Sequence, residues 1–206
     1  MRYFLLLLLF GSLFFSCEKD PEVITNTVIQ TDTVFVTNFD TVFMTLTDTV
    51  TLTEMIHDTA TTFILLRHAE TTEIGTNPNL STAGQERVME LVRLLKNVSL
   101  NAVYSTNYNR TQQTAQPVAD DQGVILDTYN PSALHSLTDG ILVDYRGGAV
   151  LVVGHSNTTS DLLNVLTGGS TFSDLPETQY DNLFLVTVFE KGRAEVTHLK
   201  YGVETP

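Results

Sequence analysis

Short apolar runs alternate with amphipathic stretches along the last two-thirds of this 206-residue chain. Apolar runs typical of buried strands lie at residues 63–66, 102–104, 124–126 and 149–153. Stretches with apolar residues at helical spacing lie at residues 81–96, 109–121, 131–142 and 157–166. Residues 183–189 and 194–199 flank Lys191-Gly192 and predict a closing C-terminal hairpin. The alternation predicts an α/β fold: a three-layer sandwich around a mostly parallel central sheet.

Three polar or cyclic residues suggest where the helices begin and end. Ser81 is placed to cap the first helix, because its side chain can accept a hydrogen bond from a free backbone amide of the first turn. Pro131 is expected to open the third helix. Pro117 predicts that the second helix kinks or ends early, because proline removes a hydrogen bond inside a helix.

The first 17 residues have the pattern of a secretory signal. Arg2 precedes an apolar run over residues 3–10, short for a membrane-spanning helix, and Cys17 ends the segment as the single cysteine of the chain. The segment resembles a bacterial lipoprotein signal, in which the cysteine is lipidated and becomes the new N-terminus. This implies an exported protein held by lipid in the bacterial cell envelope, on the periplasmic or cell-surface side. An uncleaved apolar anchor with an incidental cysteine is the alternative.

Residues 18–62 differ in composition from the rest, with no glycine, one proline and many threonines. Asp-Thr-Val recurs with an eight-residue period at Asp32, Asp40 and Asp48. Residues 41–53 alternate threonine with apolar residues, which is strand-like, but no turn signal would fold them into a sheet. We expect an extended spacer before a domain at residues 63–206. A polar edge strand added to the domain's sheet is the alternative.

The repeated tripeptides, together with Asp58-Thr59-Ala60, resemble the O-glycosylation acceptor of exported proteins in Bacteroidetes. The candidate acceptors are Thr33, Thr41, Thr49 and Thr59. Glycans there would keep an alternating threonine and apolar segment from pairing with other chains. The alternative is a threonine-rich linker with an accidental period.

The net charge of the chain argues against nucleic acid as a partner, and its basic residues gather where strands end. The formal net charge is −13, which argues against sequence-independent nucleic-acid binding. Arg67 and His68 follow the first strand directly, His155 follows the central strand, and Arg110 opens the helix after another strand. Because ligands bind at the carboxyl ends of strands in such sheets, we expect these side chains to form an anion pocket suited to phosphate.

Four sequence elements now point to a family. They occur in the family's order at residues 67–70 (RHAE), 80–84 (LSTAG), 104–115 (YSTNYNRTQQTA) and 152–155 (VVGH). Through them, residues 63 to about 199 resemble the histidine phosphatase superfamily, in its phosphoglycerate-mutase-like branch. Four short elements in the right order over roughly 90 residues are far more specific than any one of them.

The resemblance implies a role for each residue of the pocket. His68 would be the nucleophile that takes the phosphoryl group onto a ring nitrogen. Arg67, Arg110 and His155 would hold the phosphoryl oxygens and neutralise charge in the transition state, with His155 counted as catalytic too. Water would then hydrolyse the phosphohistidine, with no cofactor and no metal. The partner would be a small phosphorylated substrate or a phosphoprotein.

Two departures from the family pattern matter. The asparagine found six residues after the nucleophile in many members falls at Ile74. The glutamate that usually serves as general acid is missing from residues 129–144, where His135, Asp139 and Asp144 are the available groups. Among these, His135 and Asp139 are the candidate acids. Without a donor, hydrolysis should depend steeply on the leaving group's pKa.

Two other functions are compatible with parts of the sequence. Residues 154–158 resemble the nucleophile elbow of α/β-hydrolases, with Ser156 as nucleophile and Asp174 or Asp181 and then His198 in the hydrolase order. Thr158 stands where that elbow requires glycine, and Arg67 and His68 would have no role. The other alternative is a catalytically weak or inactive phosphate-binding module displayed on the surface.

Overall fold

The computed structural model describes residues 23–33, 45–55, 59–72 and 75–206. The chain divides after Asp58 into two units, which are described separately. The signal segment with Cys17, the candidate acceptor Thr41 and Ile74 lie outside the described residues.

In the first unit, β1 (Val23–Thr33) pairs with β2 (Thr45–Met55) as an antiparallel two-stranded sheet. Val23 lies opposite Met55, and Thr33 lies opposite Thr45. The expected extended spacer is therefore a paired sheet over these residues, separate from the sheet of the second unit. Alternating β-branched residues favour pairing strongly, even where neither glycine nor proline marks a turn.

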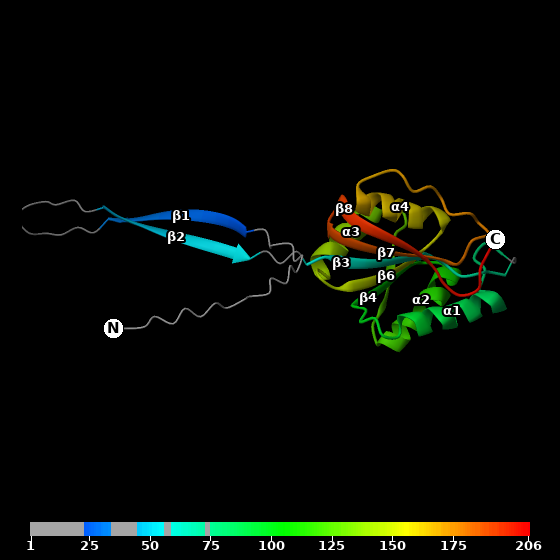
Figure 1. The fold of residues 1–206 in the computed structure, drawn as a ribbon. Helices are drawn as coiled ribbons and strands as arrows, with labels where there is room; N and C mark the ends of the chain where they lie inside the picture. The colour runs from blue at the N-terminus through cyan, green and yellow to red at the C-terminus, as the bar shows by residue number, and fades with distance from the viewer. Residues whose placement is uncertain (1–22, 34–44, 56–58, 73–74) are drawn as a thin grey trace, which may run out of the picture. The chain divides into compact units, whose positions relative to one another are not determined.

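The second unit begins at Thr59 and is built on a six-stranded mixed sheet, drawn in Figure 1. Its strands are β3 (Thr61–Arg67), β4 (Ala102–Thr106), β5 (Leu126–Tyr129), β6 (Ala149–Gly154), β7 (Asn182–Glu190) and β8 (Arg193–Lys200). They lie in the order β5-β4-β6-β3-β7-β8, and the first four are mutually parallel. β7 runs antiparallel to β3, and β8 is antiparallel to β7, so the predicted sheet and hairpin are confirmed.

Two helices cover each face of this sheet (Figure 1). They are α1 (Thr82–Leu95), α2 (Asn109–Gln122), α3 (Leu134–Asp144) and α4 (Ser156–Thr167). Successive residues of β3 point to opposite faces, as strand geometry requires. Phe63 and Leu65 pack in the core on the side of α3 and α4, whereas Ile64 and Leu66 pack on the side of α1 and α2. The predicted three-layer sandwich is the observed architecture.

One of the three predicted helix boundaries agrees with the structure, and two differ from it. Ser81 caps α1 as predicted, with its Oγ accepting from the Gly84 amide at 3.2 Å. The helix α2, however, continues through Pro117 to Gln122, and α3 begins at Leu134, three residues after Pro131. No helix in the part of the chain that the structure describes is long and apolar enough to cross a membrane.

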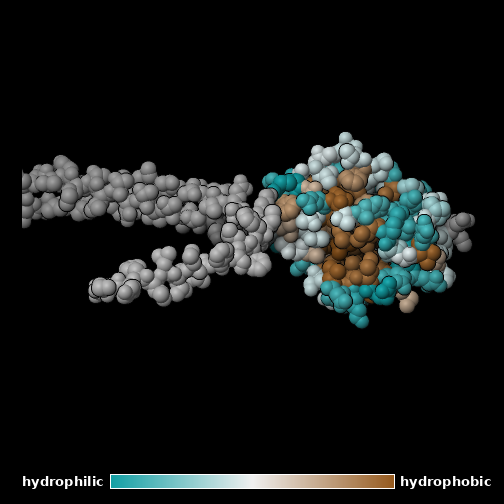
Figure 2. Space-filling model, viewed as in Figure 1, coloured by the Kyte–Doolittle hydropathy of each residue, from teal (hydrophilic) through white to brown (hydrophobic). Residues whose placement is uncertain are grey.

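The face of the second unit seen in Figure 2 carries an apolar area bordered by hydrophilic residues. It lies over the part of the sheet where β7 is labelled in Figure 1. The residues with predicted chemistry lie instead at one edge of the sheet.

Candidate active site

The predicted residues converge at the carboxyl ends of the parallel strands. Arg67 is the last residue of β3 and His68 follows it, His155 is the N-cap of α4 just after β6, and Arg110 lies in the first turn of α2. All four side chains line one cavity of about 670 Å³. The other residues that line it are Thr71, Pro78, Tyr108, Pro131, Ser156, Asn157, Thr158, Glu177 and Tyr180.

Backbone and side-chain hydrogen bonds hold His68 at the buried end of this cavity. Its amide donates to the Gly154 carbonyl at 2.9 Å, and the next amide, of Ala69, donates to Thr114 Oγ1 at 3.0 Å. The His68 side chain is buried, with 5% of its surface exposed. Its Nδ1 lies 2.8 Å from the Ala69 carbonyl oxygen, which can only accept a hydrogen bond. Nδ1 therefore carries the proton, and the lone pair is on Nε2.

Burial also keeps the His68 ring neutral. Loss of solvation and the positive charges of Arg67 and Arg110 together lower the pKa of His68 to about 3, against the hydrogen bond to Ala69 that raises it. At neutral pH the ring is uncharged, and a nucleophile needs that state because a protonated imidazole has no lone pair to donate.

His155 is held in the opposite tautomer by a chain of hydroxyl groups. Arg110 Nη2 donates to His155 Nδ1 at 3.3 Å, so that nitrogen carries the lone pair and Nε2 carries the proton. Nε2 donates to Thr106 Oγ1 at 2.9 Å, and Thr106 in turn donates to Thr111 Oγ1 at 2.9 Å. The Thr111 hydroxyl donates to the Thr106 and Tyr108 carbonyls, at 2.8 and 3.0 Å, and is the last member of this hydrogen-bond series. Burial and both arginines lower the pKa of His155 to about 4, against the charge of Glu177.

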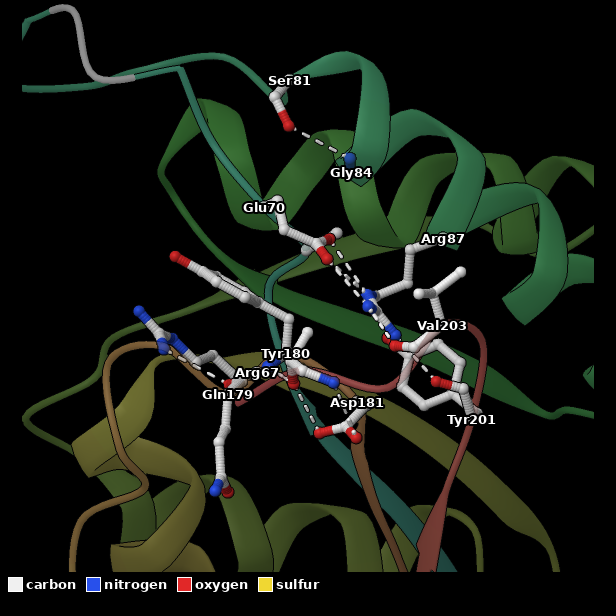
Figure 3. Close-up of polar contacts among 12 residues, drawn as sticks. Arg67, Glu70, Ser81, Gly84, Arg87, Gln179, Tyr180, Asp181, Tyr201 and Val203 are labelled. Atoms are coloured by element: carbon white, nitrogen blue, oxygen red, sulfur yellow. Dashed lines mark hydrogen bonds and ion pairs between the residues drawn. The ribbon is translucent and has the colours of Figure 1, made fainter.

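Aromatic rings position both arginines. The Arg110 guanidinium lies 4.6 Å from the centroid of the Tyr108 ring, and the Arg67 guanidinium lies 4.5 Å from that of Tyr180, which is visible in Figure 3. Cation–π contacts of this kind favour the charged guanidinium while leaving its edge free to donate hydrogen bonds. The cavity thus combines two cations with two neutral histidines, an arrangement suited to a phosphoryl group.

A loop that sequence reasoning did not connect with the site completes the cavity wall. Arg67 Nη1 donates to the carbonyls of Pro176, Glu177 and Gln179 at 3.2, 2.7 and 3.4 Å. Arg67 Nη2 forms an ion pair with the Glu177 carboxylate, whose other oxygen accepts from Ser156 Oγ. The loop precedes β7, which runs antiparallel to its neighbour, so the amino end of β7 lies at the cavity. The sequence predicted that β7 and β8 form a hairpin, but it did not predict the direction of β7 relative to β3.

The glutamate of the RHAE element has a structural position, shown in Figure 3. The Glu70 carboxylate accepts from Arg87 Nε and Nη2 at 2.8–3.0 Å. Arg87 Nη1 and Nη2 also donate to the Tyr201 and Val203 carbonyls, both at 2.7 Å. The segment after His68 is thereby tied to α1 and to residues 201–203. A Cβ on Gly84 would lie 2.1 Å from the Glu70 carbonyl oxygen, which explains why the LSTAG element needs glycine there.

The structure does not bring the candidate acids of the sequence to the cavity. His135 is exposed on α3 and lies outside the cavity lining, and Asp139 pairs with Lys191 at 2.6 Å. The hydrolase alternative is not assembled either. His198 stacks on Phe184 and bonds to Asn182, and Ser156 contacts Glu177 instead.

The remaining hydrolase residues also have other partners. Asp181 pairs with Lys200 at 2.8 Å, and Asp174 accepts from Ser160 at 3.1 Å. Within the described ranges, no group of three or more histidine, cysteine, aspartate or glutamate side chains could hold a metal ion.

Comparisons with known proteins agree with this fold. Residues 63–130 match the model of the histidine phosphatase superfamily (branch 1). No curated protein matches the chain. The protein histidine phosphatase SixA, solved with tungstate, is 17% identical, with a TM-score of 0.57 over 68% of this chain and 96% of that one.

Two further solved structures are similar to the same extent. YhfR of Bacillus stearothermophilus is 16% identical, with a TM-score of 0.57 over 66% of this chain and 95% of that one. The mycobacterial glucosyl-3-phosphoglycerate phosphatase Rv2419c is 13% identical, with a TM-score of 0.54 over 66% and 97%. At these identities the likeness establishes the fold, and the matched segment contains Arg67, His68 and Arg110. The second unit therefore has the fold of these solved phosphatases, and residues 63–130 match the histidine phosphatase superfamily.

Proposed function

We propose that this protein is a phosphatase that hydrolyses a phosphomonoester or a phosphoramidate through a phosphohistidine on His68. One observation carries the proposal: a buried, neutral His68 shares a cavity with Arg67, Arg110 and His155. A single basic side chain in a pocket would be weak evidence. Two guanidinium groups around a histidine with a free ring nitrogen match what phosphoryl transfer requires.

The chemistry proceeds in two displacements. His68 Nε2 attacks phosphorus while the bond from phosphorus to the leaving oxygen or nitrogen breaks, and the leaving group takes up a proton. Arg67 and Arg110 balance the charge on the phosphoryl oxygens, and the neutral His155 orients Arg110 by accepting from its Nη2. A water molecule then attacks phosphorus, the phosphorus–nitrogen bond breaks, and inorganic phosphate and neutral His68 are regenerated.

The substrate is a small phosphorylated molecule or a phosphoprotein, met outside the cytoplasm. The signal pattern of residues 1–17 supports export, and Cys17 at its end supports attachment of the protein to a membrane through lipid. The substrate would then meet the domain in the cell envelope, on the periplasmic or cell-surface side.

Trapping the covalent intermediate tests the proposal. Full-length protein in detergent is mixed with a ³²P-labelled aryl phosphate and quenched with alkali, because phosphohistidine survives base and is lost in acid. We expect label on the wild type, none on His68→Asn, and retained label on Ser156→Ala. Phosphate binding without label or turnover would favour the inactive binding module. Label lost only from the Ser156 variant would favour the serine hydrolase.

A further inference from the structure

The cavity holds a carboxylate that the family pattern does not place there. Among the described residues that line it, Glu177 is the one acidic side chain. The backbone of its loop is fixed by the three carbonyls that accept from Arg67, at Pro176, Glu177 and Gln179. Its carboxylate contacts Arg67 on one side and the Ser156 hydroxyl on the other. A carboxylate held on both oxygens has a defined place in the site.

We propose that Glu177 is the general acid that protonates the leaving group, an inference that rests on the phosphatase function proposed above. Displacement at phosphorus is in line, so the leaving group departs on the side opposite the nucleophile. His68 lies at the buried end of the cavity, which places the leaving group toward the opening. The Glu177 side chain lines the same cavity and is 73% exposed, as expected for a group on that side.

Arg67 links the acid to the reacting phosphoryl group. Its Nη2 is paired with the Glu177 carboxylate. A phosphoryl group bound to the same guanidinium lies next to this carboxylate and replaces it as partner of the cation. In its protonated form, Glu177 can then give its proton to the leaving atom of the same phosphoryl group.

Each step balances. The Glu177 carboxyl proton moves to the leaving oxygen as its bond to phosphorus breaks and the His68 Nε2–phosphorus bond forms. The resulting carboxylate takes a proton from the attacking water in the second step, as phosphorus passes from nitrogen to the water oxygen. Ser156 Oγ, which donates to the Glu177 carboxylate, is a positioning group for this acid.

The test compares two substrates on full-length wild type and Glu177→Gln. One is p-nitrophenyl phosphate, whose leaving group needs no proton, and the other is a simple alkyl phosphate. We expect kcat for the alkyl phosphate to fall about 10²-fold or more, the usual size of general acid catalysis, while kcat for the aryl phosphate changes less than about 3-fold. The high-pH limb of the alkyl profile should disappear. Glu177→Asp, which keeps a proton donor, should recover part of the loss, and Glu86→Gln, an exposed carboxylate on α1, should change neither rate.

The other outcomes are distinct. An unchanged alkyl kcat with a lowered KM would overturn the inference, because it would make Glu177 only a competing anion on Arg67. Equal losses on both substrates would also overturn it, since they would indicate a damaged phosphate site. In either case activity that requires His68 leaves the phosphatase function standing. If the wild type hydrolyses neither substrate and takes no label, the proposed function fails and this inference fails with it.

Discussion

His68 and His155 line the cavity together in a T-shaped contact, with ring centroids 5.5 Å apart and planes 70° apart, and their hydrogen bonds impose opposite tautomers. The Ala69 carbonyl fixes the proton of His68 on Nδ1, whereas Arg110 and Thr106 fix that of His155 on Nε2. One ring therefore presents a nucleophilic nitrogen, and the other places its lone pair against a guanidinium. Two histidines of the same type acquire different roles through their neighbours.

The first prediction concerns stability and pH. The pKa of His68 is lowered to about 3 and that of His155 to about 4, from 6.5 for a free side chain. Below pH 6.5 the unfolded chain binds protons that the folded chain does not, so the free energy of unfolding falls as pH falls toward 3–4. The contribution of His68 is on the order of a few kcal/mol. Urea unfolding at pH 7 and pH 4 should show a smaller loss of stability for His68→Asn than for the wild type.

A matched control is available on α3. His135 is an exposed histidine, so His135→Asn should leave the pH dependence of unfolding unchanged. An equally steep loss in the wild type and in His68→Asn would mean that His68 is not held neutral by burial.

The second prediction concerns the hydroxyl chain behind His155. Thr106→Val keeps the shape but removes the oxygen that accepts from His155 Nε2. A buried donor left without a partner costs about 1–3 kcal/mol. Where the transition state bears this whole cost, kcat/KM falls roughly 5- to 150-fold. Steady-state kinetics on an aryl phosphate measure this, and Thr106→Ser should restore most of the rate. Identical rates for all three proteins would show that the tautomer of His155 does not matter.

The third prediction concerns the ion pair of Glu70 and Arg87. The Arg87 side chain is 3% exposed, and Arg87→Met leaves the Glu70 carboxylate and two backbone carbonyls without their partner. Breaking one side of a buried pair costs about 3–5 kcal/mol. On the same helix, Arg93 pairs with Glu90 but its side chain is 74% exposed, so Arg93→Met should cost about 0–1 kcal/mol. Urea unfolding of the two variants should rank them in this order, and equal costs would contradict the structural role given to Arg87.

The fourth prediction concerns the threonine-rich segment. If its Asp-Thr-apolar tripeptides are glycan acceptors, intact-mass analysis of the protein from its own organism should show added hexose-type masses that Thr33→Val, Thr49→Val and Thr59→Val each reduce. Thr47→Val, a threonine in the same segment that does not follow an aspartate, should leave the mass pattern unchanged. A polypeptide of unmodified mass at these positions would leave the segment a plain tether.

The sequence predicted the arginines and histidines of the site, but not the loop that carries Glu177 and Tyr180. Arg67, His68 and His155 could be placed because each follows a parallel strand, and parallel strands share an edge. Glu177 and Tyr180 escaped because they precede β7, and only its antiparallel direction brings that end to the cavity. The helix α2 ran past Pro117 because tertiary packing outweighs one lost hydrogen bond. The pairing of β1 with β2 joins two strands separated by residues 34–44, where the sequence has no glycine or proline to signal a turn.

The direction of β3 determines where the domain can be attached to a solid support without blocking the cavity. The strand runs from Thr61, whose hydroxyl oxygen accepts from the Gly147 amide, to Arg67 at the cavity. Seven residues of extended chain separate these two ends by about 20 Å. A biotin or resin attached just before Thr59 would therefore leave the cavity open to solution. Immobilised in that orientation, the domain could be offered folded phosphoproteins as readily as small phosphates.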